Sequence, residues 1–234
     1  MAVGAVAADR VQVPVWSGGQ QWLVSWHPPP DPPDGTPHGA EGVCVTAGGD
    51  IVVISPDGTI WDLPAGRPEP GESWEQTLRR EMDEEACATV IRARLLGFTR
   101  GHCVTGPERG LVLVRSVWRA DVELRPWEAR FEIADRRVVA PAAVEDALSL
   151  GSQPFAPFIR RELQEAAARL PVAWSLITIS IRTSRRWGSS APRPGRAAPG
   201  RRRRDQRDGL RRDRAAALRV RRSLVQDQHH HCWN

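Results

Sequence analysis

Three glutamates near the middle of the chain have a spacing that could bind a metal ion. If the segment is helical, Glu84 and Glu85 lie on either side of Glu81, within about a third of the helix circumference. Like charges this close raise one another's pKa unless a cation offsets them. Hard divalent ions such as Mg2+ prefer all-oxygen ligands of this kind. The spacing therefore predicts half of a metal site, and an ordinary solvated acidic face is the competing interpretation.

The helix that must position these glutamates has clear signals for its start and its buried face. Ser73, followed by Gln76 three residues later, is typical of a capping box. An apolar residue recurs at every fourth position, in the order Trp74, Leu78, Met82 and Ala86. We expect a helix over residues 74–87. Because its apolar stripe runs alongside the acidic one, the carboxylates should lie at the edge of the helix–sheet contact, in a cleft.

The residues around the glutamates carry a family resemblance. Gly66, five residues, Glu72, seven residues and then residues 80–85, with the sequence REMDEE, match the first six fixed positions of the Nudix box. The preceding WDLPAG also resembles the family's approach to the box. Cys87 and Ala88 depart from the pattern, since the family has a glycine and a larger aliphatic residue there. A cysteine in a left-handed cap should cost about 1 kcal/mol unless the turn is rebuilt.

The resemblance implies a hydrolase that cleaves a nucleoside diphosphate linked to another moiety, by metal-assisted attack of water on phosphorus. It implies that Glu81, Glu84 and Glu85 bind Mg2+ or Mn2+, and that the Gly66 carbonyl is a further candidate ligand. No other cofactor is expected. The substrate would be a small nucleotide or nucleotide-sugar.

The remaining catalytic candidates also come from the resemblance. Arg80 would orient a glutamate, either Glu72 or Glu81. For the base that activates water, Glu81 is the first candidate within the box, and Glu132 or Glu128 could serve from downstream. The competing interpretation of these last two is ordinary surface glutamates.

The elements around the box predict the fold class. Strand patterns occur over 42–47, 51–55, 90–100 and 111–124, with a looser one over 131–140, and helix patterns over 142–150 and 157–170. This order of strands, helix, strands and helix predicts an α/β (α+β) chain with helices packed on a mixed sheet. The resemblance implies the more specific Nudix-like fold, a mixed β-sheet sandwiched between α-helices.

Composition divides the chain into three parts. Residues 1–37 form an extension ending in a proline-rich linker, in which QWLVSW is either a strand pairing with the next domain or a loose lid. The resemblance implies that residues 38–171 form the Nudix domain. Residues 172–234 contain sixteen arginines against four acidic residues in low-complexity sequence, which predicts a disordered tail.

The basic tail suggests a second function class. Its arginines could contact nucleic acid phosphates, with an affinity that falls as salt rises, although an altered reading frame at the end of a GC-rich gene would give the same composition. The alternative to an enzyme is a catalytically inactive Nudix-fold binding module whose tail contacts nucleic acid or a partner. A homodimer is also compatible with the sequence.

The four cysteines are scattered without a CxxC pair, which argues against a zinc knuckle or a disulfide framework. Neither a signal peptide nor a membrane span is evident in the sequence, so we expect a cytoplasmic protein without a membrane partner. A nucleophilic pair of His102 and Cys103 is disfavoured, because adjacent residues on a strand point to opposite faces. The HHHC sequence near the end is interpreted as an accident of the tail.

Overall fold

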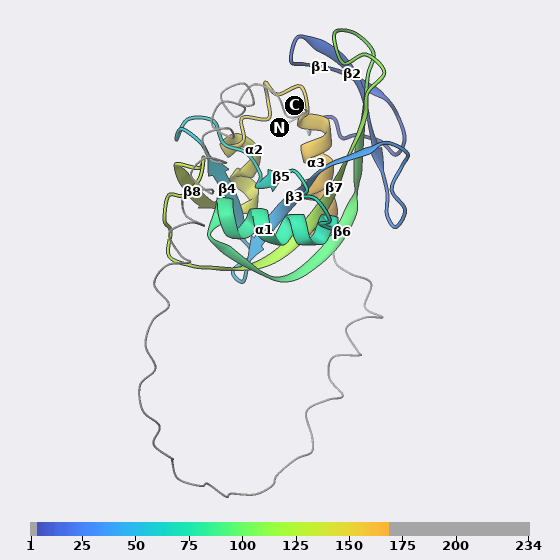
Figure 1. Cartoon of the computed structure of the whole chain (residues 1–234). Coiled ribbons are helices and arrows are strands. Elements are labelled where there is room, and N and C mark those ends of the chain that lie inside the picture. The colour runs from blue at the N-terminus through green and yellow to red at the C-terminus, as the bar shows by residue number, and fades with distance from the viewer. Residues whose placement is uncertain (1–3, 169–234) are drawn as a thin grey trace, which may run out of the picture. The chain divides into compact units, whose positions relative to one another are not determined.

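A mixed β-sheet forms the centre of the fold (Figure 1) in a computed structural model that describes residues 4–168. The strand order is β1-β2-β6-β7-β3-β4-β8, with β5 pairing with β3. Strands β3 and β7 are parallel, whereas the other pairs are antiparallel. The elements are β1 (Val13–Ser17), β2 (Gln20–His27), β3 (Thr36–Thr46), β4 (Ile51–Ser55), β5 (Ala65–Gly66), α1 (Trp74–Ala86), β6 (Ala88–Cys103), β7 (Val112–Leu124), β8 (Asp135–Val139), a 3-10 turn (Pro141–Ala143), α2 (Val144–Ala147) and α3 (Ala156–Ala167).

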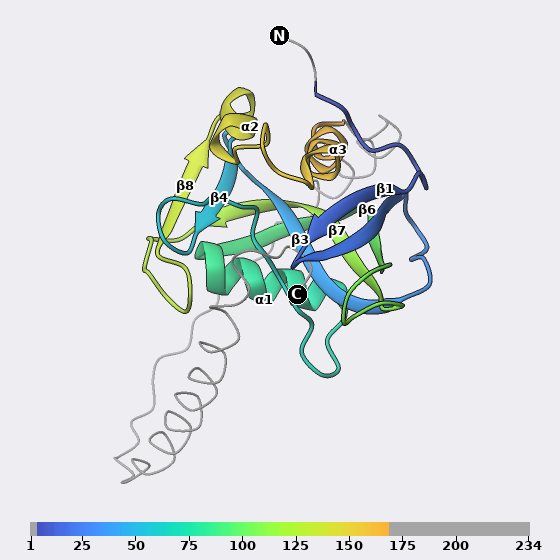
Figure 2. The same ribbon diagram turned by 90° about the horizontal axis from the view of Figure 1, so that it is seen from above.

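Helices cover both faces of the sheet, with α1 on one side and α2 and α3 on the other (Figure 2). The α1 face is packed so closely that a Cβ added to Gly42 would lie 2.9 Å from Leu78 Cδ1. Residues alternate between the faces along β3, so Cys44 contacts Met82 whereas Val43 belongs to the core under α3. The predicted sandwich of a mixed sheet between helices is confirmed.

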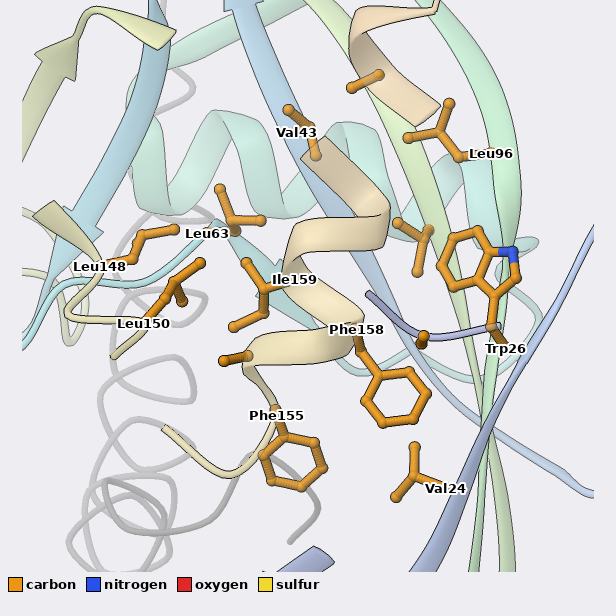
Figure 3. Close-up of a cluster of buried hydrophobic side chains, with 14 of the residues drawn as sticks. Val24, Trp26, Val43, Leu63, Leu96, Leu148, Leu150, Phe155, Phe158 and Ile159 are labelled. Atoms are coloured by element: carbon orange, nitrogen blue, oxygen red, sulfur yellow. The ribbon is translucent and has the colours of Figure 1, made fainter. Parts of the chain in front are cut away.

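The core on the α3 face is built from large apolar side chains (Figure 3). Phe158 and Ile159 of α3 and the preceding Phe155 are buried and face the sheet. They pack with Trp26 and Val24 of β2, which precede residue 38, where the predicted domain begins. Burial of side chains this large stabilises the fold by roughly 1.5–3 kcal/mol each relative to exposure.

The segment QWLVSW is a strand of the main sheet. Strand β2 pairs with β6, with Trp26 opposite Thr99, and its side chains Trp22, Val24 and Trp26 are fully buried. This confirms the strand interpretation over the lid. The division of the chain after residues 37 and 171 stays a prediction, although β3 already begins at Thr36. The tail over 172–234 lies outside the described residues.

Two downstream elements are shorter than their patterns predict. Only residues 135–139 of the segment 131–140 pair with β4. The start of the segment forms a turn instead, in which Phe131 has a left-handed backbone with φ 53° and Ile133 forms an isolated bridge with Arg130. The expected helix over 142–150 is a 3-10 turn followed by the four-residue α2. Both begin without a side-chain cap, and Ser149 has a left-handed backbone with φ 53° where the pattern would continue the helix.

Helix α1 starts as its sequence predicts. Ser73 Oγ accepts from the Gln76 N–H at 3.3 Å, and Gln76 Oε1 accepts from the Ser73 N–H at 2.8 Å. These reciprocal bonds form the capping box and satisfy two N–H groups at the helix start. The helix covers Trp74–Ala86, one residue shorter than expected.

The end of α1 keeps the left-handed cap without a glycine. Cys87 has φ 46° and ψ 45°, and its N–H donates to the Met82 carbonyl. An arginine from β8 supplements this cap, because Arg136 Nη1 donates to the Ala86 carbonyl at 2.6 Å and lies 3.4 Å from that of Cys87. A cation at a helix C-terminus is favourable both as a hydrogen-bond donor and with respect to the helix dipole.

The strain at Cys87 can be measured by comparing two variants. Cys87→Gly and Cys87→Ala both remove the thiol that donates to the Glu128 carbonyl, so they differ mainly in the cost of a Cβ in the left-handed region. We expect the glycine variant to be more stable by about 1 kcal/mol in urea-induced unfolding. Equal stability of the two variants would show that the backbone at this position is not strained.

None of the helices within residues 4–168 is long and apolar enough to cross a membrane.

Candidate metal-binding site

The acidic stripe of α1 lies against the short strand β5. Glu81 and Glu85 are 7% and 8% exposed, while Glu84 is half-buried. A Cβ added to Gly66 would lie 2.0 Å from the Glu81 carboxyl carbon, so a side chain at this position would displace the Glu81 carboxylate. The Ala65 N–H donates to Glu85 Oε2 at 3.0 Å. The structure therefore brings the predicted ligands Glu81, Glu85 and Gly66 together.

Arg80 is the centre of the hydrogen-bond network around these carboxylates. Its Nε and Nη2 donate to the two oxygens of Glu72 at 2.9 and 3.0 Å. Its Nη1 donates to Glu81 Oε1 at 2.6 Å and to Glu84 Oε2 at 3.2 Å, and Nη2 also reaches the Arg67 carbonyl at 2.7 Å. The sequence left open whether Arg80 orients Glu72 or Glu81, and its guanidinium donates hydrogen bonds to both. Planar donors in a fixed fork suit this arrangement.

Glu72 is held as an anion. The Arg80 hydrogen bonds lower the pKa of Glu72 to about 2, against the opposing effect of desolvation. The Thr77 hydroxyl and the Glu69 N–H donate to the same carboxylate oxygen. A carboxylate that stays ionised and fully bonded at neutral pH is suited to orienting Arg80, and unsuited to accepting a proton from water.

Glu85 has the opposite electrostatic environment. Burial raises the pKa of Glu85 well above its ordinary range, and the charges of Glu81, Glu132 and Asp62 raise it further. Burial also raises the pKa of Asp62 to about 7, with Glu41 adding to the effect. Several carboxyl groups thus share a region whose negative charge is poorly compensated, which a bound cation would offset.

The donor set fits a hard divalent cation in chemical type, since carboxylate and carbonyl oxygens are the ligands that Mg2+ prefers. In the present arrangement Arg80 engages one oxygen each of Glu81 and Glu84. Within residues 4–168, no three acidic, histidine or cysteine side chains are grouped closely enough to hold a metal ion as they stand. The oxygen ligands and the negative charge of the site therefore suit a divalent ion, while one carboxylate oxygen of Glu81 and one of Glu84 accept hydrogen bonds from Arg80.

The two downstream candidates for the base differ in position. Glu132 is close enough to Glu85 for its charge to raise that residue's pKa. The Glu128 side chain instead forms an ion pair with Arg130 at 3.2 Å, and its carbonyl accepts from the Cys87 thiol. Only Glu132 is thus brought electrostatically near the acidic stripe. Which glutamate acts as the base stays a prediction.

Sequence reasoning missed Asp62, which affects the pKa of Glu85 from the strand-like segment before Gly66. The only signal was its place in WDLPAG, just ahead of the box. The disfavoured pair of His102 and Cys103 is not a nucleophilic site, since Cys103 is fully buried and donates to Gln20 and Thr105 while His102 faces the other way and is half-buried.

A family model described as the NUDIX domain matches residues 36–165. No curated protein matches the sequence. Among solved structures, a Bacillus subtilis pyrophosphohydrolase, BsRppH, is 20% identical, with a TM-score of 0.48, covering 73% of this chain and 98% of its own. A NUDIX hydrolase from Nitrosomonas europaea is 21% identical, with a TM-score of 0.45 and coverage of 59% and 95%.

Proposed function

The chain belongs to the Nudix family, since the NUDIX domain accounts for residues 36–165, and from this premise we propose that it is a Mg2+-dependent pyrophosphohydrolase. Mn2+ is a second candidate ion. The proposed substrate is a nucleoside diphosphate linked to another moiety, such as a nucleotide or nucleotide-sugar. The observation that carries the proposal is the Arg80 network, which orders Glu72, Glu81 and Glu84 beside the Gly66 loop.

The proposed metal ligands are Glu81, Glu84 and Glu85, with the Gly66 carbonyl as a further candidate. When bound, a divalent ion would neutralise charge on the pyrophosphate and make water a better nucleophile. The uncompensated negative charge around Glu85 supports this proposal, because a structural helix face would gain nothing from burying it.

The chain's own groups have separable roles in this proposal. Arg80 holds Glu81 and Glu84 in place, and Glu72 holds Arg80 from the other side. The Ala65 N–H orients Glu85. Glu81 is the first candidate for the base that removes a proton from water, and Glu132 is the second, because it is the downstream glutamate whose charge acts on Glu85.

Basic side chains near the Gly66 loop support an anionic substrate. Burial lowers the pKa of His38 to about 3, and the positive charges of Arg115 and Arg67 lower it further. Arg115 Nε and the Gly66 carbonyl both border Gly39, since a Cβ added there would lie 3.2 and 3.1 Å from them. Arg115 is paired with Glu41 at 2.9 Å. Together with Arg67 it places positive charge beside the carboxylate cluster, an arrangement suited to phosphate groups and metal ions together.

A panel of nucleoside diphosphate derivatives tests the activity. The panel should include oxidised nucleotides, ADP-ribose, NADH and diadenosine polyphosphates, each with Mg2+ and with Mn2+, and products should be read as phosphate and mononucleotide. We expect hydrolysis of at least one compound that stops when EDTA removes the metal. Hydrolysis that continues undiminished in EDTA would exclude the proposed mechanism.

The second candidate function is an inactive binding module, favoured by the sixteen arginines of residues 172–234. It requires that no compound be turned over under any metal condition. It also requires salt-sensitive DNA binding by the full chain that is lost on truncation to residues 1–171. A cytoplasmic location and a homodimer remain proposals that accompany either function.

A further inference from the structure

A groove lies in the N-terminal part of the chain, and none of its lining residues belongs to the proposed metal site. It has a volume of about 490 Å³ and is lined by the segment before β1, by β2, by the proline-rich loop over residues 28–34 and by Arg100 of β6. All of its lining residues except Arg100 precede residue 36, where the match to the NUDIX domain begins. The family relationship therefore does not account for this groove.

Arg10 enters the groove from a fixed backbone position. Its N–H donates to the Trp26 carbonyl at 2.7 Å, and the neighbouring Asp9 forms a bridge with Trp26. The φ of Arg10 is +58°, a left-handed conformation that costs a residue with a side chain roughly 1–2 kcal/mol. Within residues 4–168 its guanidinium has no hydrogen-bond or ion-pair partner. The fold thus fixes the backbone of Arg10, and no described residue pairs with its charge.

Arg100 lines the groove from β6. It lies directly across from Ser25 in the β2–β6 register, and its Nε donates to the Asp34 carbonyl at 3.0 Å. This bond connects β6 with the proline-rich loop and uses one edge of the guanidinium. No carboxylate among the described residues forms an ion pair with it, so its charge, like that of Arg10, is available to a ligand.

His27 of β2 lines the same groove as the two arginines. Its Nε2 is 3.0 Å from the hydroxyl of Ser25, which is 2% exposed and so fixes the orientation of the ring. Burial lowers the pKa of His27, and the charges of Arg100 and Arg10 lower it further. Both guanidinium groups are therefore close enough for their positive charge to act on the ring, and an anion placed among the three groups would relieve that repulsion.

We propose that this groove binds a phosphate group through the guanidinium groups of Arg10 and Arg100 and the ring of His27. Guanidinium forks match phosphate oxygens in bidentate geometry, and a neutral imidazole supplies one further N–H. Asp31 and Asp34 also line the groove. Their carboxylates disfavour a bare anion but accept hydrogen bonds from hydroxyls, so the ligand class is a sugar phosphate in preference to inorganic phosphate.

The test uses the full chain, without added metal, and follows the His27 ring by NMR, with its resonance assigned from a His27→Asn variant. The pH titration is repeated with inorganic phosphate and with ribose 5-phosphate, at an ionic strength held constant with chloride. A bound phosphate favours the charged imidazolium, so we expect the His27 pKa to rise by about one unit or more. Ribose 5-phosphate should bind at least several-fold more tightly than inorganic phosphate.

Arg10→Gln is the deciding variant, because its side chain has no partner in the described residues and its removal leaves the fold intact. It should weaken ribose 5-phosphate binding about tenfold or more, whereas Arg109→Gln, which alters an exposed arginine outside the groove, should bind like the unaltered chain. A His27 pKa unmoved by either ligand, or an unchanged affinity in Arg10→Gln, would overturn the site. Equal affinity for the two ligands would overturn the sugar component. None of these results depends on the proposed hydrolase activity.

Discussion

Glu84→Gln combined with Glu85→Gln is expected to reduce Mg2+-dependent hydrolysis by roughly three orders of magnitude. The variant keeps side chains of nearly the same shape and leaves Glu85's position with an acceptor for the Ala65 N–H. It removes two anionic donors from the acidic stripe, and a metal ion that neutralises a transferring phosphoryl group contributes several kcal/mol to the barrier. The measurement is the initial rate on the best compound of the panel over a range of Mg2+ concentrations.

Thermal unfolding separates loss of metal binding from loss of structure. Mg2+ binding to the folded state should raise the Tm of the unaltered chain and leave that of the double variant unchanged. Without metal, the double variant should be at least as stable, because it lacks the buried carboxylate whose pKa is raised by its neighbours. Glu75→Gln with Glu123→Gln makes the same charge change at exposed positions and should retain full activity. Retained turnover in the Glu84 and Glu85 variant would sink the proposed mechanism.

The helix and its start could be predicted from the sequence because their determinants are local. Ser73 and Gln76 form their bonds three residues apart, and Leu78, Met82 and Ala86 share a buried face because of helical periodicity alone. The spacing of Glu81, Glu84 and Glu85 is set by the same periodicity. For these residues, local sequence and tertiary structure agree.

The surroundings of the site could not be predicted, because they depend on contacts between segments far apart in the chain. Arg136 caps α1 from a strand 50 residues downstream of Ala86. Asp62 acts on Glu85 because the segment before β5 crosses beside α1. No pattern within either segment indicates these encounters, since an isolated Arg or Asp in a strand is usually an ordinary surface residue.

The N-terminal part of the fold shows the same limit for strands. The sequence left QWLVSW open as either a strand or a loose lid, because its partner strand β6 lies more than 70 residues away. Pairing with β6 also determines which residues line the groove, because it places Arg100 opposite Ser25 and close enough to His27 for its charge to act on the ring. The residues of that groove had no recognisable spacing in the sequence, whereas the three glutamates of the proposed metal site lie on one helix.

Arg80→Lys is expected to lower kcat/KM by about a hundredfold although it preserves the positive charge. The guanidinium donates to Glu72, Glu81 and Glu84 and to the Arg67 carbonyl at the same time. A lysine ammonium has three donors from a single atom and cannot span these acceptors, so the carboxylates should relax from their positions. Misplacement of catalytic groups by about 1 Å can cost this much in rate. We also expect a loss of about 2 kcal/mol in unfolding free energy, from hydrogen bonds between charged groups in a partly buried setting.

The neighbouring Arg79→Lys is the matched control. Arg79 pairs with Glu75 at the surface, where both side chains are more than 40% exposed, and its Nη1 donates to the Val90 carbonyl at 2.8 Å. Its replacement should change stability by about 1 kcal/mol and leave turnover unaffected. Combining Arg80→Lys with Glu72→Gln tests how Arg80 acts. If Glu72 works by orienting Arg80, the two losses will not add, because the second change removes an interaction that the first has already disrupted. Additive losses would instead require that Glu72 contact the metal or the substrate independently of Arg80.

Full activity in Arg80→Lys would show that only the charge of this residue is needed, and that the fork of hydrogen bonds around it serves the fold alone.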